Sequence, residues 1–351
     1  MNHDQAMMQL AINAAKEGRF LTWQNPMVGA AVVKDGHVLA LGHHVKYGAV
    51  HAERNAIEKL TPEQLFNATL YVTLEPCNHQ GKQPPCSELI IHSKIKRVVI
   101  GQTDPHALVT GKGIARLKTA GIEVVTGVLA DQAAALNPFY TYFFQHHQPW
   151  ITLKQAISLD LKLSLPGQRI TLSSSAALKQ VHFERANYQG ILIGSETAII
   201  DDPSLLTTVK SPFPPIRMII DRRGRLRNHP NLKLLTDGVA PTWIFTQNNQ
   251  LGNHQWPAHV KVISLADGQL SSVIDYLTDQ GIQSLYVEGG RRLHQAFCDA
   301  GLGNELITYL APVTLGANGV PAYQPKAGQL IKPSYQFFGN TIRIQGGIQN
   351  V

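Results

Sequence analysis

Three side chains in the first third of the chain could bind one metal ion. His51 stands two residues before Glu53, and the segment EPCNHQGKQPPC (75–86) then supplies Cys77 and Cys86. His-x-Glu alone is equally typical of a solvated first turn of a helix, but two cysteines in this order favour a metal site. Because only three good ligands are present, a tetrahedral zinc ion would keep an open position for water, as catalytic zinc sites do.

Glu53 could supply the proton chemistry of such a site. Zinc lowers the pKa of bound water from about 15.7 to about 7, and a carboxylate that does not bind the metal can carry the proton to a ring nitrogen and a leaving amine. His-x-Glu followed by Pro-Cys and a second Cys is the signature of zinc-dependent hydrolytic deamination. That signature has a short gap between its cysteines, whereas eight residues separate Cys77 from Cys86. In this insert we expect His79 to face the substrate and Lys82 to bind a phosphate, the alternative being a solvated loop.

The residues before position 146 are predicted to alternate between strand and helix. Asp35-Gly36, between two apolar runs, predicts a tight hairpin turn. Cys77 would follow a strand that ends at Pro76 and Cys86 would begin a helix, and both placements favour a thiolate. The expected strands cover residues 27–34, 37–42, 69–76, 97–101 and 122–127. The expected helices cover residues 4–17, 51–60, 86–95, 111–121 and 131–145.

A polar stretch with a proline, HHQPW (146–150), separates this series from a second one. We therefore predict two domains, 1–147 and 148–351, since a chain of 351 residues exceeds the usual size of one domain. Strands that alternate with helices imply an α/β layer fold in both. In the second domain, strands are expected near residues 150–158, 190–194, 216–221, 241–246, 260–264, 284–290 and 306–312. Helices are expected near residues 174–187, 270–281 and 291–300.

The composition is that of an ordinary globular protein, with 44% hydrophobic and 16% charged residues. No run of 18 apolar residues is present, and residues 1–20 read as a mature helix rather than a signal peptide, so we expect a cytoplasmic protein without a membrane span. Three cysteines are too few for a disulfide framework. The net charge of +7 is compatible with an anionic partner, either nucleic acid or a phosphorylated metabolite.

Three segments resemble the deaminase half of the bifunctional pyrimidine deaminase/reductase family of riboflavin biosynthesis: NPMVGAAVV (25–33), HAE (51–53) and TLEPCNHQGKQPPC (73–86). The resemblance implies an N-terminal cytidine-deaminase-like domain with three α/β/α layers. It implies one zinc ion held by His51, Cys77 and Cys86, with Glu53 as the proton shuttle. It further implies substrate contacts from Asn25, His44, His79, Lys82 and Asp104.

Three clusters stand out in the second domain: GSETAIIDDPSLL (194–206), DRRGRLR (221–227) and VEGGRRLH (287–294). The last gives a strand, two glycines and then a helix, which is a natural cradle for phosphate. The alternatives are an ordinary turn, a solvated basic edge and a pair of glycines required by packing. No Gly-x-Gly-x-x-Gly follows the first strand, so a Rossmann dinucleotide site is not supported.

Segments in this half resemble the reductase half of the same family, which has a dihydrofolate-reductase-like α/β fold: KQAISLD (154–160), RANYQGILIGSETAIIDDPSLL (185–206), IRMIID (216–221) and VEGG (287–290). The resemblance implies NADPH as the cofactor and delivery of a hydride to C1′ of a ribosyl group. The implied catalytic residues are Lys154 and Asp201. The implied substrate-binding residues are Arg185, Leu205, Thr208 and Glu288, and the implied cofactor-binding residues are Thr171, Thr197, Asp201, Arg222, Gly289, Gly290, Arg291 and Arg292.

Several positions depart from the family pattern. Val50 replaces a usual Pro, and His106 replaces a usual Asn and so changes one ribose or phosphate contact. Leu161 replaces the Gly of a Ser-Leu-Asp-Gly pattern, and no Trp lies between residues 151 and 242. Arg222 stands where a small or polar residue is common; Arg recognises phosphate through paired hydrogen bonds, so we expect Arg222, or its neighbour Arg223, to bind the 2′-phosphate of NADPH. An inactive reductase half is the alternative.

The leading interpretation is a two-step metabolic enzyme that acts on a phosphorylated pyrimidine, without nucleic-acid or membrane partners and as a homodimer. The alternative is a zinc deaminase that acts on tRNA or single-stranded DNA, which would need a basic groove with stacking aromatic residues. Aromatic residues make up only 7% of the chain, and none interleaves with the arginine cluster. A deaminase fold used only for binding is disfavoured because Glu53 and all three zinc ligands are present.

Overall fold

The computed structural model describes residues 2–78, 84–252, 254–323 and 328–348, so His79 and Lys82 lie outside the described residues. The chain divides into two compact units, Met1–His147 and Gln148–Val351, each of which is described by itself. Within the described ranges, no helix has both the length and the apolar character needed to cross a membrane.

The first unit is built on a five-stranded sheet with the strand order β2-β1-β3-β4-β5. The strands are β1 (Gly29–Lys34), β2 (His37–His43), β3 (Thr69–Leu74), β4 (Arg97–Gln102) and β5 (Glu123–Thr126). β1 runs antiparallel to β2 and β3, whereas β3, β4 and β5 are parallel. The carboxyl ends of these three parallel strands therefore meet at one edge of the sheet.

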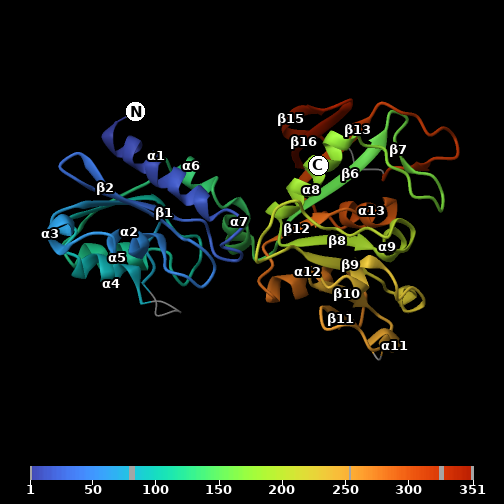
Figure 1. Cartoon of the computed structure of the whole chain (residues 1–351), viewed down its shortest axis with the longest axis horizontal. Helices are drawn as coiled ribbons and strands as arrows, with labels where there is room; N and C mark the ends of the chain where they lie inside the picture. Colours follow the sequence, from blue (N-terminus) through green and yellow to red (C-terminus); the bar gives the residue numbers. More distant parts are fainter. Residues whose placement is uncertain (1, 79–83, 253, 324–327, 349–351) are drawn as a thin grey trace. The chain divides into compact units, whose positions relative to one another are not determined.

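Helices cover both faces of this sheet (Figure 1). They are α1 (His3–Ala15), η1 (Lys16–Gly18), α2 (Ala52–Ile57), α3 (Pro62–Leu65), α4 (Cys86–His92), α5 (Lys112–Thr119), α6 (Ala130–Ala134) and α7 (Pro138–His146). Successive side chains of a strand point to opposite faces: Ala30 and Val32 pack with buried residues of α2, α4 and α5, while Ala31 and Val33 pack against α1. The predicted three-layer α/β/α architecture is confirmed.

Two local predictions have different outcomes. The β1–β2 hairpin turns at Asp35 and Gly36, whose φ angles of 50° and 78° are both left-handed, as the predicted tight turn requires. The single helix predicted over residues 131–145 is wrong, because the structure has two helices, α6 and α7. Pro138 begins α7, and a proline disfavours helical geometry in the residue before it; Asn137 accordingly has φ −133° and ψ 56°.

The second unit contains a nine-stranded sheet with the order β11-β10-β9-β8-β12-β6-β13-β16-β15. Its strands are β6 (Trp150–Ser158), β8 (Gly190–Gly194), β9 (Ile216–Ile220), β10 (Thr242–Thr246), β11 (Val260–Ser264), β12 (Ser284–Val287), β13 (Glu305–Ala311), β15 (Leu330–Phe338) and β16 (Thr341–Ile348). The strands from β11 to β13 in this order are parallel, and β16 and β15 continue the sheet as an antiparallel hairpin. β7 (Lys162–Ser164) and β14 (Val320–Pro321) form a separate small sheet.

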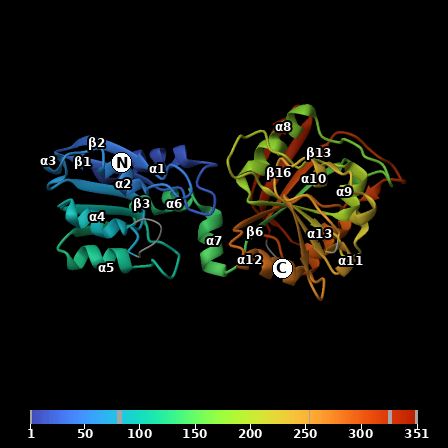
Figure 2. The same ribbon diagram turned by 60° about the horizontal axis from the view of Figure 1, so that its bottom comes forward.

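The helices of the second unit are α8 (Ser175–Glu184), η2 (Arg185–Asn187), α9 (Ser195–Asp201), η3 (Arg225–Asn228), α10 (Lys233–Thr236), α11 (Asn249–Gly252), α12 (Leu270–Asp279) and α13 (Arg291–Asp299). Apolar residues of α12 and α13 pack on one face of the sheet, with Leu285 and Val287 of β12. Tyr286 points to the opposite face, where its hydroxyl donates to Glu184 at the end of α8. Helices α8, α9, α12 and α13 are arranged around this sheet (Figures 1 and 2). The second unit is thus also a layered α/β fold, as predicted.

Some elements of this unit were not predicted from the sequence. No strand was expected over β15 and β16, and no helix was expected over α9. β15 lies at the edge of the sheet with most of its side chains exposed, so its sequence has no buried face to produce alternation. The sequence of β15 also contains Pro333, and a proline is disfavoured within a strand.

Candidate functional sites

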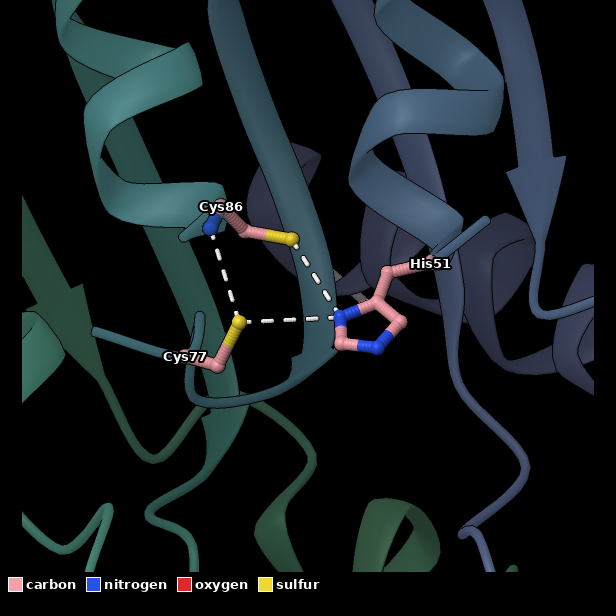
Figure 3. A group of neighbouring side chains, drawn as sticks. All are labelled: His51, Cys77 and Cys86. Atoms are coloured by element: carbon pink, nitrogen blue, oxygen red, sulfur yellow. Dashed lines mark hydrogen bonds between the residues drawn. The ribbon is translucent and has the colours of Figure 1, made fainter. Parts of the chain in front are cut away.

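Three side chains converge where two helices begin beside the end of β3. His51 directly precedes α2, Cys77 follows β3, and Cys86 is the first residue of α4. Nδ1 of His51 lies 3.6 Å from Sγ of Cys77 and 3.4 Å from Sγ of Cys86. Figure 3 shows the imidazole ring and both sulfur atoms directed toward one another.

The donor set and its spacing fit a zinc ion. Zinc binds one imidazole nitrogen and two thiolates at about 2.0–2.3 Å, and tetrahedral ligands at those bond lengths lie roughly 3.6 Å apart. The three ligand atoms all lie within 4.8 Å of one another. Among the described residues the cluster has these three members, which would leave a fourth tetrahedral position for water or substrate.

Both ends of the insert between the two cysteines are fixed by hydrogen bonds. The backbone N–H of Cys86 donates to Sγ of Cys77 at 3.4 Å, and the N–H of Ser87 donates to the carbonyl oxygen of Cys77 at 3.1 Å. The Ser87 hydroxyl donates to the side-chain oxygen of Asn78 at 2.7 Å. These hydrogen bonds hold Cys77 and Cys86 close together although eight residues separate them in the sequence, so both thiols can reach one metal site.

The electrostatic environment suits a metal ligand and a proton carrier. Hydrogen bonds from Cys86 and His51 lower the pKa of the Cys77 thiol, as expected, but the hydrogen bond with Cys77 and burial raise the pKa of the Cys86 thiol, contrary to the expectation for a helix start. A bound metal ion requires both thiols to be deprotonated. Glu53, in the first turn of α2, is only 3% exposed, and burial raises the pKa of its carboxyl group. A raised pKa allows a carboxyl group to accept and release a proton closer to neutral pH.

Two of the predicted substrate contacts lie beside the metal cluster. The side-chain amide of Asn25 donates to Nε2 of His44 at 3.1 Å, so His44 carries its proton on Nδ1, which faces the carbonyl oxygen of Val50 at 3.0 Å. Burial lowers the pKa of His44 and keeps the ring neutral. The His44 ring meets the edge of the His51 ring with centroids 5.6 Å apart. Asn25 and His44 thus form a hydrogen-bonded pair next to a proposed zinc ligand.

Asp104, a third predicted contact, lies in the segment after β4 and is almost fully buried. Its burial raises the carboxyl pKa to about 6, while the N–H of His106 donates to it at 2.8 Å. The residue that holds this segment in place was not predicted from the sequence. Glu75, two residues before Cys77, accepts hydrogen bonds from four backbone N–H groups, those of Asp104, Gly111, Gly113 and Ile114. The position of Glu75 within the motif TLEPC (73–77) was the signal in the sequence that could have indicated its role.

The second unit brings together three residues predicted to serve the reductase. Arg185 donates from Nε and Nη2 to the two oxygens of Glu288, at 2.6 and 3.0 Å. Lys154 of β6 lies 3.5 Å from the same carboxylate, and its ammonium group sits 5.7 Å from the centre of the Tyr309 ring. Burial raises the pKa of Glu288, but Arg185 and Lys154 lower it further, to about 2. The cluster is therefore a carboxylate that two cations keep ionised.

The segment predicted to cradle a phosphate lies at the start of α13. Gly290 directly precedes this helix, whose first N–H groups have no partner within the helix. A Cβ atom added to Gly290 would lie 3.7 Å from Oγ1 of Thr197, so these two predicted cofactor contacts are neighbours. The exposed Arg292 pairs with Glu196 at 3.2 Å, and Arg291 is also exposed.

The other predicted reductase residues lie elsewhere. Asp201 ends α9 and is half-buried, and burial raises its pKa. Leu205 is buried with φ 50°, and the N–H of Thr208 donates to the carbonyl oxygen of His182. Thr171 is exposed, and so is Arg222 beyond the end of β9. In the part of the chain that the structure describes, no hydrogen bond or ion pair joins these five side chains to the Lys154 cluster.

Comparison with known proteins identifies both units. Residues 1–102 match the cytidine and deoxycytidylate deaminase zinc-binding region, and residues 149–337 match the RibD C-terminal domain. The riboflavin biosynthesis protein RibD of Bacillus amyloliquefaciens is 41% identical over 90% of this chain and 86% of its own length. This chain belongs to the RibD family.

Other RibD proteins agree with this assignment over most of the chain. RibD of Escherichia coli is 34% identical over 90% of this chain and 89% of its own length. The solved structure of Acinetobacter baumannii RibD has a TM-score of 0.88 and 33% identity, with 99% of each chain covered. A Thermotoga maritima structure named diaminohydroxyphosphoribosylaminopyrimidine deaminase/5-amino-6-(5-phosphoribosylamino)uracil reductase has a TM-score of 0.88, 32% identity and the same coverage. RibD membership confirms the resemblance, and the nucleic-acid deaminase alternative is not favoured.

Proposed function

We propose that this RibD protein is a bifunctional enzyme of riboflavin biosynthesis, with a zinc-dependent deaminase domain over residues 1–147 and an NADPH-dependent reductase domain over residues 148–351. The deaminase domain removes the amino group of 2,5-diamino-6-ribosylamino-4(3H)-pyrimidinone 5′-phosphate, and the reductase domain converts the ribosyl group of the product into ribityl. The convergence of His51, Cys77 and Cys86, with buried Glu53 beside them, carries the first assignment.

In the deaminase domain, His51 and the two cysteines would hold zinc, which supplies a water molecule of lowered pKa. The oxygen of that water would bond to the ring carbon that carries the amino group, while Glu53 takes one proton from it and delivers this proton to the adjacent ring nitrogen. Glu53 then carries the remaining proton of that oxygen to the amino group, the C–N bond breaks, ammonia leaves, and the carbon keeps the oxygen as a carbonyl. Asn25 and His44 are joined by a hydrogen bond and would orient the pyrimidine as a unit. The resemblance assigns further substrate contacts to Asp104, His79 and Lys82.

In the reductase domain, NADPH supplies the hydride for C1′ of the ribosyl group. The bond between C1′ and the ring oxygen breaks, and that oxygen takes up a proton to become a hydroxyl group, so one hydride and one proton are consumed. Lys154 is the proposed proton donor, because Glu288 and the Tyr309 ring hold its ammonium group in one place. Thr197 and the Gly289–Gly290 turn at the start of α13 are proposed to hold the pyrophosphate.

The test uses the purified full-length protein with zinc. Ammonia release is measured with the pyrimidine phosphate and with tRNA and single-stranded DNA, and the oxidation of NADPH is followed on the deaminated product. We expect ammonia from the pyrimidine phosphate alone and NADPH oxidation on its product. Ammonia without NADPH oxidation would contradict the reductase assignment and support an inactive second half.

A homodimer and a cytoplasmic location are the finer parts of this proposal. The exposed edge strand β15 carries Tyr335 and Phe337, which are 64% and 75% exposed, and such an edge is a template for pairing with another strand. We therefore propose that β15 pairs with β15 of a second copy, and Phe337→Lys should then yield monomers in light-scattering measurements. The three cysteines form no disulfide, which is compatible with a reducing compartment, and imaging of a fluorescent fusion would test the location.

A further inference from the structure

One face of α7 contacts the segments that carry two of the proposed substrate-binding residues. Asn137, Tyr140, Thr141 and Phe144 are spaced at i, i+3, i+4 and i+7, and residues at these intervals share one face of a helix. Each of the four contacts a residue near the site. Gln102, the last residue of β4, donates to the Thr141 hydroxyl at 3.3 Å. Neither matched family region includes α7, since they end at residue 102 and begin again at residue 149.

The first contact holds the segment that contains Asn25. The side-chain oxygen of Asn137 accepts from the N–H of Met27 at 2.7 Å, and its amide donates to the carbonyl oxygen of Met27 at 2.8 Å. These two bonds fix the backbone two residues after Asn25, whose side chain in turn donates to His44. The start of α7 thus restrains one proposed substrate contact.

The second contact is made to Asp104. The Tyr140 hydroxyl lies 3.0 Å from one carboxylate oxygen of Asp104 and 3.3 Å from the other, so its proton is shared between them. One turn further along α7, Phe144 packs against the ring of His106 with centroids 4.2 Å apart, and the Tyr140 and Phe144 rings are 4.7 Å apart. Helix α7 therefore contacts both Asp104 and His106.

Tyr140 restrains a part of Asp104 that no other described side chain restrains. Glu75 holds the backbone N–H of Asp104 at 3.3 Å but does not touch its carboxylate. The N–H of His106 fixes one carboxylate oxygen, which leaves the plane of the group free to turn. The Tyr140 hydroxyl, by reaching both oxygens, sets that plane.

We propose that Tyr140 is a positioning residue for deamination, which orients the Asp104 carboxylate to accept hydrogen bonds from the pyrimidine phosphate. This inference rests on the proposed function, because it requires that Asp104 binds the substrate of the deaminase domain. Under this proposal α7 contributes to substrate binding in the deaminase domain. It does so through Asp104, since Tyr140 forms no hydrogen bond with the three proposed zinc ligands in the described residues.

The test compares Tyr140→Phe with Tyr142→Phe, which removes a hydroxyl from another face of the same helix, where Tyr142 stacks on His146. Zinc content, kcat and KM for ammonia release are measured on the full-length protein. A hydrogen bond to a charged group is strong, so Tyr140→Phe should raise KM about 10-fold while kcat changes less than about 2-fold and zinc stays at one per chain. Tyr142→Phe should change neither constant by more than about 2-fold.

A double-mutant cycle separates positioning from a general effect on the fold. In an Asp104→Asn background, Tyr140→Phe should change KM by less than about 2-fold, because the group it positions is already altered. An unchanged KM in Tyr140→Phe, fully additive effects in the cycle, or loss of zinc from Tyr140→Phe would each overturn the inference. If the wild-type protein released no ammonia, the proposed function itself would be wrong. The results that would overturn the role of Tyr140 all require an active wild-type protein, so the two failures can be distinguished.

Discussion

Arg185 and Glu288 are 103 residues apart in the chain, yet two parallel hydrogen bonds join them in the interior of the reductase domain. Their side chains are 9% and 10% exposed, so little water screens the pair. A fork of two bonds fixes the carboxylate in direction as well as position. Lys154 lies 3.5 Å from Oε2 of the same carboxylate, which also accepts from Arg185, so its ammonium group is held at a defined place in the site.

This ion pair predicts how the reductase domain responds to acid. The pKa of Glu288 falls from 4.5 to about 2 on folding, so the unfolded chain takes up its proton at a higher pH than the folded chain does. The stabilisation is therefore complete above about pH 5 and is lost as the pH falls toward 2, a change on the order of 3 kcal/mol. Glu288→Gln should lower the free energy of unfolding at pH 7 and flatten its dependence on pH in this window.

Urea unfolding of the full-length protein at a series of pH values measures this effect. Glu196→Gln is the matched control, because Glu196 forms an exposed pair with Arg292 and should contribute less than about 1 kcal/mol. If Glu288→Gln and the wild type lost stability in parallel between pH 5 and pH 2, Glu288 would not be the ionised group described here.

Glu53→Gln should retain zinc but lose deamination. The substitution preserves size but cannot accept the proton, and general acid–base catalysis contributes roughly 10²- to 10⁴-fold to a rate. Metal analysis and ammonia release test this, with Glu58→Gln, an exposed residue just after α2, as the control. Full deaminase turnover in a zinc-loaded Glu53→Gln variant would exclude Glu53 as the proton carrier.

Cys77→Ser and Cys86→Ser should each lose zinc and deaminase activity together, while NADPH oxidation on the deaminated product continues. A serine hydroxyl is a poor zinc ligand beside a thiolate, and only three protein ligands are proposed. Cys298→Ser is the control, because this cysteine lies on α13 in the other domain. Tight binding of one zinc per chain by either serine variant would show that the ligand set is wrong.

Arg222→Ala should weaken the binding of NADPH but not of NADH. Arg222 is exposed just beyond the end of β9, and a charge-assisted bond to the 2′-phosphate is worth roughly 1.5–3 kcal/mol. The KM for NADPH should rise roughly 10- to 100-fold, with the KM for NADH and ammonia release unchanged. Arg223→Ala tests the neighbouring residue in the same assay.

Arg227→Ala is the control for this pair, since the Arg227 side chain already donates to Gln250 at 2.6 Å. Equal losses with NADPH and NADH would contradict a 2′-phosphate contact at either position. So would unchanged constants for NADPH in both the Arg222→Ala and the Arg223→Ala variants.

Local patterns in the sequence predicted the features that are determined by residues close together in the chain, such as turns and the ends of helices and strands. The hairpin at Asp35-Gly36 was predictable because left-handed turns favour these residues. His51, Cys77 and Cys86 could be proposed as one cluster because each stands at the boundary of a predictable element. β15 could not be predicted, since an exposed edge strand has no buried face to impose a pattern.

Contacts between distant segments could not be predicted in the same way. Nothing in the sequence around Tyr140 indicates that its hydroxyl meets Asp104, 36 residues earlier, and Asn137 binds a backbone 110 residues away. Both contacts, that of Tyr140 with Asp104 and that of Asn137 with Met27, depend on the direction of α7, which is set by the break between α6 and α7. Its signal, Pro138, was present but was read as part of one long helix.

The fixed ends of the insert after Cys77 have an evolutionary consequence. Cys77 and Cys86 are joined to each other, and Asn78 to Ser87, so hydrogen bonds hold the two ends of this stretch together beside the proposed ligands. We therefore expect substitutions between these ends to have been tolerated in evolution with less effect on metal binding than substitutions of Cys77 or Cys86.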